Sequence, residues 1–261
     1  MKALAFELSG KTAIFKKPDV NSYAYFTYNN IHKVALLGLL GAIIGLEGYN
    51  QQSRKNREQK NIKIKETGNT NSPDFPDFYQ LLNPLKVSIV PKGNKGYFSK
   101  KIQVFNNSVG YASKEQGGNL IVMEQWLENP CWDIFILDDH AIDASVFAKL
   151  EDYLINQKCE FIPYLGKNDH IAQINHCQKV DLDESNSRNI DSLFILKNTQ
   201  LDRFVKNDAR PYLFKEIAPI SMNGSYNFYE YEEFALTNLK IKNPESLAPL
   251  YSYRDLTLSF F

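Results

Sequence analysis

The stretch KALAFELSGKTAIFKKPDVNSYAYFTYNNIHKVALLGLLGAIIGL, residues 2–46, decides the fold of the first half of this chain. Residues 3–8 alternate small or polar side chains with apolar ones, as a half-buried strand does. Residues 34–46 are all apolar or glycine, and this run is too short to cross a bilayer, so it predicts a buried helix. Three glycines, Gly38, Gly41 and Gly45, fall on one face of that helix, where another backbone can approach closely. We expect the helix to lie flat on a sheet.

Later stretches carry the same kinds of signal. Residues 85–91 alternate as a second strand, and residues 134–137 form a short apolar run that is typical of a central strand. Residues 159–165 predict a further strand. A second helix is expected after the candidate cap Asp143, because the following apolar residues fall on one stripe. These residues are Val146, Phe147, Leu150 and Leu154.

Between these elements lie a long hairpin and a polar segment. Residues 102–105 and 120–126 can pair as the two arms of a hairpin, and its tip, residues 106–119, is rich in Asn, Ser and Gly. Residues 51–71 are basic and hold almost no large apolar side chain, so they predict a mobile basic loop.

In chain order the pattern is strand, helix, strand, inserted hairpin, strand, helix and strand. This is the α+β, ferredoxin-like plan that RNA-recognition folds share. We therefore expect an RNA-binding domain over residues 1–170, with the hairpin at about 102–124, and a smaller strand-rich addition over residues 171–261.

Composition describes an ordinary globular chain of 261 residues with 43% hydrophobic residues, enough for a substantial core. Its net charge is zero, but residues 1–120 hold 17 Lys and Arg against 8 Asp and Glu, a balance of +9, and the remainder has a balance of −9. This asymmetry favours a polyanion bound on one side and protein partners on the other, unless the two halves interleave and their charges cancel in space.

The three cysteines, Cys131, Cys159 and Cys177, are odd in number, which argues against a disulfide framework and for a reducing compartment. Lys2 leads directly into the first strand, without the apolar core of a signal peptide. We expect a cytoplasmic protein with no membrane partner.

Four stretches, in order along the first 170 residues, resemble the Cas five family, the CRISPR-associated subunits of type I interference complexes, and most closely its type I-B branch. They are FELSGKTAIFKKPDVNS at the start, the helix VALLGLLGAIIGL, EQWLENPCWDIFIL at residues 124–137, and PYLGKNDH at residues 163–170. The last 90 or so residues resemble no family in this way. The resemblance implies a RAMP domain in which the hairpin is the family's thumb, reaching along the RNA towards the next subunit.

The same resemblance implies a non-catalytic subunit of a Cascade complex that binds and caps the 5′ handle of the crRNA in antiviral defence. Its expected partners are that handle, the Cascade backbone subunit and the Cascade large subunit. Target DNA beside the flanking motif is a further candidate partner. A stand-alone RNA-binding module is another hypothesis, and it would bind the handle tightly without any partner.

The loop over residues 16–33 combines what single-stranded RNA binding requires, namely cations for phosphates, aromatic rings for stacking and amides for base edges. An Asn at position 29 or 30 could cap the following helix, so that its free amide groups and Lys33 form an anion site. The segment KGNKGYFSKK, residues 92–101, repeats this chemistry with glycines that admit a phosphate closely. The candidate RNA contacts are Lys16, Lys17, Asn21, Ser22, Tyr23, Tyr28, Asn29, His32, Lys33, Lys92, Lys95, Lys100, Lys101, Asn106 and Asn107.

Each of these groups also has a structural interpretation. Tyrosines near a strand end often pack in the core or at its rim, and the lysine-rich segment could be a solvated turn. The polarity of the hairpin tip, by itself, indicates only an exposed turn.

We expect neither a cofactor nor a metal ion. His170, His176 and Cys177 lack a fourth ligand at a familiar spacing, and Asp138-Asp139-His140 more simply satisfies the loop before the second helix. The alternative function is a metal-independent endoribonuclease that processes precursor crRNA, as the resemblance implies for type I-C members of the family. Such cleavage needs a base, an acid and a cation, and only His32-Lys33 beside Tyr28 places a histidine in that setting.

Overall fold

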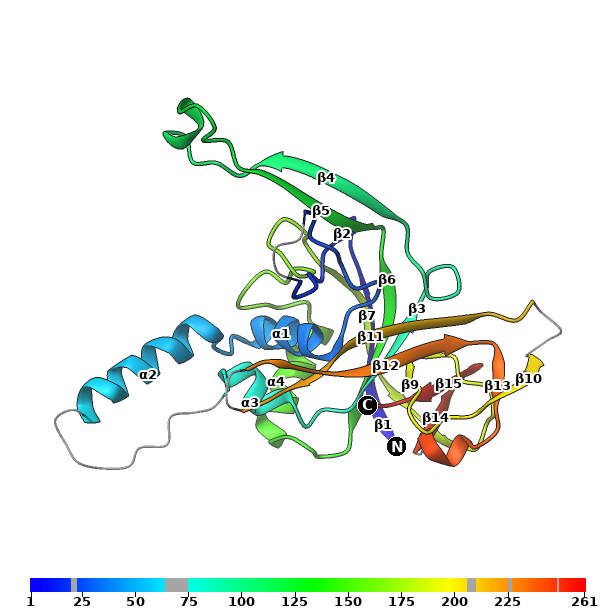
Figure 1. Ribbon diagram of the computed structural model, residues 1–261. Helices are drawn as coiled ribbons and strands as arrows, with labels where there is room; N and C mark the ends of the chain where they lie inside the picture. Colours follow the sequence, from blue (N-terminus) through cyan, green and yellow to red (C-terminus); the bar gives the residue numbers. More distant parts are fainter. Residues whose placement is uncertain (20–22, 64–74, 206–209, 225–226, 248) are drawn as a thin grey trace.

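The computed structural model describes residues 1–19, 23–63, 75–205, 210–224, 227–247 and 249–261. It is a mixed α/β protein in which the paired strands are antiparallel (Figure 1). The largest sheet has four strands in the order β3-β6-β1-β7. These strands are β1 Lys2–Ser9, β3 Val87–Pro91, β6 Cys131–Asp138 and β7 Gln173–Asp181.

The predicted strands at 3–8, 85–91 and 134–137 are confirmed as β1, β3 and β6. Both predicted helices are confirmed as well. They are α1 Lys33–Ile44 and α4 Ala144–Ile155. The carboxylate of Asp143 caps α4 by accepting hydrogen bonds from the backbone N–H groups of Ser145 and Val146. Helix α1 ends two residues earlier than expected, because Gly45 takes a left-handed conformation with φ of 79°.

The glycine face of α1 does not lie on the sheet as predicted. It receives the short helix α3, Asp77–Leu82, and a Cβ atom added at Gly41 would lie 2.5 Å from the Cβ of Phe78. The opposite, apolar faces of α1 supply the main core together with β1 and β6, and Leu36, Leu37 and Leu40 have no exposed surface. The missing side chains therefore serve a helix–helix contact.

Two other predictions are wrong. Residues 159–165 form a loop, and the fourth strand of the sheet is β7, so this sheet extends beyond residue 170 to Asp181. The predicted basic loop begins as a helix, α2 Tyr49–Lys63, because its Gln, Arg, Lys and Glu residues are good helix formers even without an apolar stripe. Residues 64–71 of that predicted loop lie outside the described residues.

Within the described part of the chain, no single helix is both long and apolar enough to cross a bilayer. Helix α1 and the first turns of α2 reach that length and composition only together, and they are bent by 78° at the break between them.

The predicted long hairpin is confirmed. Its arms are β4 Lys100–Asn106 and β5 Ile121–Glu128, which extend away from the body of the molecule (Figure 1). A two-residue strand, β2 Thr12–Ala13, pairs with the base of β5 and completes a three-stranded sheet in the order β2-β5-β4. A single 3₁₀ turn, Ala112–Lys114, lies at the tip.

The chain after β7 is built mainly of short strands. One small sheet has the order β11-β12-β9, a second has β15-β14-β8, and β10 pairs with β13. Strand β11 also packs beside α1, and Phe214 and Phe234 of this part join the main core. The strand bounds are β8 Asp183–Ser185, β9 Phe194–Ile195, β10 Leu201–Val205, β11 Leu213–Met222, β12 Tyr229–Thr237, β13 Leu239–Ile241, β14 Leu250–Tyr253 and β15 Leu256–Ser259. A 3₁₀ helix, Pro244–Leu247, precedes β14.

Candidate nucleic-acid interface

The described parts of the basic-aromatic loop, residues 16–19 and 23–33, pair with each other and dock on β5. Lys16 and Thr27 form an antiparallel bridge, and the N–H of Lys17 donates to the carbonyl of Phe26 at 2.8 Å. Tyr25 donates to the carbonyl of Met123 and accepts from the N–H of Gln125, both at 2.8 Å. These backbone bonds fix the loop at the base of the hairpin, so its side chains are presented on an ordered frame.

Three lysines gather at this base. The side chain of Lys16 is exposed and its Nζ lies 3.3 Å from the centre of the Tyr25 ring, a cation–π contact. The Nζ of Lys17 lies 5.3 Å from the centre of the Tyr28 ring. Lys100 lies close enough to Lys17 for their positive charges to repel each other. Burial lowers the pKa of Lys100, the nearby carboxylate of Glu216 raises it, and the charge of Lys17 lowers it, with a net downward shift. Among the described residues, none of these three ammonium groups forms an ion pair within 4.0 Å.

Exposed aromatic side chains accompany these cations. Tyr23 is 89% exposed and Phe26 is 42% exposed, both on the loop that carries Lys16 and Lys17. On the other face of the hairpin, Lys101 lies over the ring of Trp126 at 5.5 Å. Cations beside available π-faces are the groups that single-stranded RNA binding uses for phosphates and bases.

The residues at the start of α1 are turned inward, which corrects the predicted anion site. His32, and not an asparagine, caps the helix, since its Nδ1 accepts the N–H of Ala35 at 3.2 Å. The backbone N–H groups of Asn29 and Asn30 donate to the carboxylate of Glu216, at 2.8 and 3.3 Å. The protein's own carboxylate from β11 therefore occupies the place that we predicted for a phosphate.

The side chains of Asn29, His32 and Tyr28 are buried, and these residues leave the set of candidate RNA contacts. Asn29 donates to the carbonyl of Gly96 and accepts from the N–H of Phe98, so it fixes the 92–101 segment from inside. His32 lies among the rings of Phe15, Tyr28 and Tyr229, and burial lowers its pKa to about 3. Burial also raises the pKa of Tyr28.

Lys33 is 9% exposed, and burial together with the charge of Lys86 lowers its pKa to about 8. It too leaves the set of candidate contacts.

The remaining predicted residues do not all join the cluster. Lys92 is ion-paired with Glu7 at 2.8 Å and Asp133 at 3.4 Å on the four-stranded sheet. Lys95 is exposed and lies near Tyr212, at 5.7 Å from the ring centre, beside the strand-rich part.

At the hairpin tip, Asn106 closes the turn by bonding to Asn119 and to the N–H of Ser108, and Asn107 donates its backbone N–H to Leu120. Asn21 and Ser22 lie outside the described residues.

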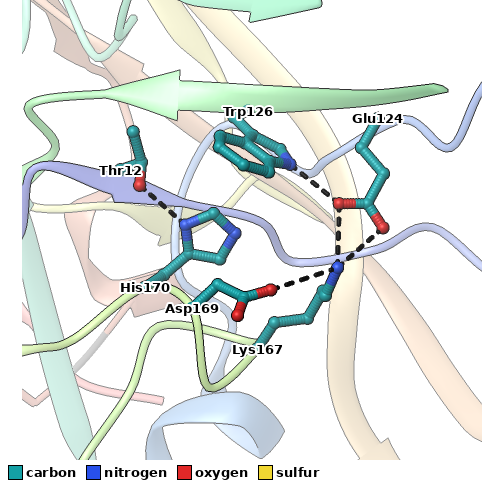
Figure 2. A network of polar contacts seen from close by, with 6 residues as sticks. All are labelled: Thr12, Glu124, Trp126, Lys167, Asp169 and His170. Carbon is teal, nitrogen blue, oxygen red and sulfur yellow. Dashed lines mark hydrogen bonds and ion pairs between the residues drawn. The ribbon is translucent and has the colours of Figure 1, made fainter. Parts of the chain in front are cut away.

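A polar network holds the base of the hairpin to the loop 163–170, as Figure 2 shows. The carboxylate of Glu124 on β5 is 5% exposed and accepts bonds from Trp126 Nε1 at 2.8 Å and from Lys167 Nζ at 3.0 Å. Lys167 also lies 3.7 Å from Asp169. The charges of Glu124 and Lys167 neutralise each other, and these bonds fix the orientation of the hairpin base.

His170 completes the contact between these segments. Its Nδ1 lies 2.7 Å from the hydroxyl of Thr12, and its ring meets Trp126 edge to face with 4.6 Å between ring centres (Figure 2). Burial lowers the pKa of His170, which favours the neutral ring. Three of the quoted sequence stretches, those at the start of the chain, at 124–137 and at 163–170, thus meet in one place.

Sequence reasoning missed Glu216, Glu124 and Lys167 as residues that organise this interface. Glu124 and Lys167 belong to stretches that were noted, but their pairing joins positions 43 residues apart. Glu216 had no local signal, since it reaches Asn29 across 187 residues.

No group of three or more His, Cys, Asp or Glu side chains in the described part of the chain is arranged to hold a metal ion.

The fold is similar to that of a chain in a solved CRISPR RNA-guided surveillance complex, with a TM-score of 0.51, 11% sequence identity and coverage of 92% of both chains. Two weaker similarities are to a CRISPR protein from Archaeoglobus fulgidus (TM-score 0.47, 8% identity, 99% of this chain and 98% of that chain) and to a chain of a type III-B Cmr-beta complex (TM-score 0.45, 10% identity, 92% and 85%). No protein-family model and no curated protein matches the sequence. The first similarity shows that this chain shares the fold of a chain of that surveillance complex.

Proposed function

We propose that this chain is an RNA-binding subunit of a CRISPR effector complex, of the Cas five type and the type I-B branch, acting in the cytoplasm. In this role it binds and caps the 5′ handle of the crRNA without cleaving it, and it contacts the backbone and large subunits. The sequence resemblance of four stretches supports the assignment to this branch. The fold similarity to a chain of a surveillance complex supports the wider class.

The arrangement of elements supports a ferredoxin-like RAMP domain. Reading the sheet from its outer edge gives the order β7-β1-β6-β3, with α1 following the first strand and α4 following the third. This is the order of a split βαβ fold, in which two βαβ units interleave. The hairpin β4–β5 is inserted between the second and third strands of that sheet, and we assign it as the thumb.

One observation carries the proposal: lysines that form no ion pair with any described residue lie beside exposed aromatic rings on an ordered frame at the base of this hairpin. Lys16, Lys17 and Lys100 provide positive charge, and Tyr23 and Phe26 provide π-faces. A chain of zero net charge can bind a polyanion in this way, because the local positive potential of these clustered lysines, and not the total charge of the chain, attracts the polyanion.

The endoribonuclease alternative loses the residues on which it depended. A base for the RNA 2′-hydroxyl must come within hydrogen-bond reach of that group. The ring of His32 is enclosed by three aromatic rings, and its Nδ1 is engaged in capping α1. Lys33 is buried beside it. We therefore assign binding, and not cleavage, to this chain.

Incubating the purified chain with labelled repeat RNA in a chelator tests both parts of the proposal. The RNA should shift to a complex and remain intact. Lys16→Glu and Lys17→Glu should each weaken binding at least tenfold. Lys242 is an exposed lysine just after β13, and Lys242→Glu should change binding less than threefold. Specific cutting of the RNA would move the chain into the enzyme class, and equal effects of all three variants would disprove this interface.

The salt dependence provides a second measurement on the same RNA. If Lys16, Lys17, Lys100 and Lys101 each neutralise about one phosphate, the logarithm of the affinity should fall with the logarithm of salt with a slope near 3. Replacing one of them by Gln should reduce that slope by about 0.7. A slope near zero for the unaltered chain would contradict phosphate binding.

A further inference from the structure

A second surface, outside the RNA interface, consists of apolar side chains on the loop between α4 and β7. Phe161 is 60% exposed, Ile162 66%, Tyr164 45% and Ile171 54%. Tyr164 and Ile171 are joined by an antiparallel bridge, so the four residues belong to one folded loop. We call these four residues the 161–171 surface. Exposed apolar residues that gather in one place usually mark an interaction site.

This loop is held rigidly by backbone bonds to the body of the protein. The N–H groups of Glu160 and Phe161 donate to the last carbonyls of α1, those of Ile43 at 2.8 Å and Ala42 at 3.2 Å. The N–H of Ala172 donates to the carbonyl of Pro163 at 3.0 Å. Leu165 accepts the N–H of Ile14 at 3.1 Å and donates its own N–H to the carbonyl of His170 at 2.7 Å. The apolar side chains are therefore presented in a fixed arrangement, which lowers the entropy lost when a partner binds.

A pocket of about 190 Å³ opens beside this surface. Its walls come from α1, α4, the loop and β7, and most of them are apolar. They include Ile43, Tyr153, Leu154, Pro163 and Ile174. A pocket of this size admits one large apolar side chain, and such an anchor beside an apolar rim is how protein interfaces concentrate their binding energy.

Charged groups of both signs surround this surface, including Lys149, whose ammonium group donates to the carbonyl of Ile44 and lies over the ring of Tyr153. Lys158 pairs with Asp152 at 2.9 Å, Glu160 accepts the hydroxyl of Tyr153, and Lys167 pairs with Glu124 at 3.0 Å. A polyanion or an anionic lipid surface would meet the carboxylates of Asp152 and Glu160 beside these ammonium groups and be repelled by them. The complementary partner is therefore an uncharged and apolar protein segment.

Strand addition does not explain the surface. Strand β7 is an edge of its sheet, but it carries a bulge where its register with β1 shifts, and His176 there has φ of 54°. Bulges of this kind protect an edge against pairing with another strand. Recognition at this place must rely on side chains.

We infer that the 161–171 surface docks an uncharged, apolar segment of a protein subunit of the same complex, with one large apolar side chain in the pocket beside Pro163. This assignment rests on the proposed function for the existence of that complex. The surface belongs to the loop whose other end, Lys167 to His170, holds the base of the hairpin, so docking and RNA binding share one rigid support.

The chain contains its own reporter for this contact. Cys159 is an exposed free cysteine that lines the pocket. The other two cysteines are partly buried, and burial raises the pKa of Cys131 to about 11 and of Cys177 to about 12, so their thiols are slow to form the reactive thiolate. Maleimide should therefore label Cys159 selectively in the free chain. In the complex purified from its own cells, labelling of Cys159 should slow at least tenfold.

A matched pair of variants completes the test. Ile162→Asp and Ile217→Asp place the same charge at sites that are 66% and 62% exposed, the second on β11. Ile162→Asp should release one protein subunit, with at least a tenfold loss of affinity, while the crRNA remains bound. Ile217→Asp should retain every subunit.

Four results would overturn the inference. They are full retention of subunits by Ile162→Asp, unchanged labelling of Cys159 in the complex, a dimer of the pure chain that Ile162→Asp dissociates, and binding to phosphatidylglycerol vesicles that Ile162→Asp abolishes. Subunit retention together with normal RNA binding would leave the proposed function standing. Loss of a subunit from a complex in which the chain contacts no RNA would support the docking surface and contradict the RNA role.

Discussion

Substituting alanine for Gly41 in α1 should destabilise the protein, although alanine favours helices. A Cβ atom at Gly41 would lie 2.5 Å from the Cβ of Phe78 and 3.5 Å from its Cα. The first distance is about 1 Å shorter than an ordinary carbon–carbon contact. Because the backbone of α3 fixes the position of the Phe78 Cβ, rotation of the Phe78 side chain cannot relieve the clash. Helix α3 itself has to move.

Gly38 provides the matched control. It lies one turn away on the same helix face, and a Cβ there would meet Phe78 only at an ordinary 3.7 Å. Replacing glycine by alanine inside a helix gains about 1 kcal/mol in either case. Overpacking a filled contact costs about 1–3 kcal/mol. Gly38→Ala should therefore gain up to about 1 kcal/mol, and Gly41→Ala should lose up to about 2 kcal/mol.

Urea unfolding followed by circular dichroism measures both free energies of unfolding, provided that the transition is two-state. Thermal melts should agree, with a shift of about 2–4 °C for each kcal/mol in a domain of this size. Gly41→Leu should destabilise the protein further. Equal stabilisation by Gly38→Ala and Gly41→Ala would refute the close packing of α3 on α1.

Three further predictions concern a buried histidine, a helix cap and an exposed ring. Burial lowers the folded-state pKa of His32 to about 3, so as the pH falls the unfolded chain binds a proton before the folded chain does. The free energy of unfolding should therefore decrease as the pH drops from about 6.5 towards 3. His32→Asn keeps a capping side chain, and urea titrations of this variant should show a weaker pH dependence. Asp143→Ala should lower the free energy of unfolding by about 1 kcal/mol, whereas no loss would show that the cap of α4 is not needed. Tyr23→Ala should weaken RNA binding by about 1–3 kcal/mol, as expected for one lost stacking contact, without changing the melting temperature, and Phe161→Ala should leave RNA affinity unchanged.

Much of the fold follows from local patterns. The alternation in β1 and the unbroken apolar run of α1 are signals that a few consecutive residues carry, and both elements are present. Strand β7 was missed because its exposed face is polar over most of its length, and it becomes a strand only by pairing with β1, about 170 residues earlier. Its neighbour at 159–165 has more apolar residues, but it is bonded to α1 and to residues 14 and 172 and has no strand partner beside the sheet.

The candidate site, like the fold, could be predicted only in part from local sequence. Local composition selected Lys16, Lys17 and Tyr23 in one basic-aromatic segment and Lys100 in a second one, and the structure brings these lysines to the base of the hairpin. Composition could not show which of the predicted side chains are buried, because burial depends on contacts with residues that are far away in the sequence. Asn29 and His32 are enclosed because β11 and β12 supply Glu216 and Tyr229 from the far end of the chain.

Photo-crosslinking most directly tests whether the base of the hairpin binds RNA. The purified chain is irradiated with a repeat RNA that carries 4-thiouridine throughout its 5′ handle, and the crosslinked peptides are identified by mass spectrometry. The crosslinks should fall on Tyr23, Phe26 and the lysines of β4, and Lys17→Glu should reduce them in proportion to the lost affinity. Crosslinks confined to β11–β13, or none above those of an unrelated RNA of equal length, would contradict the account.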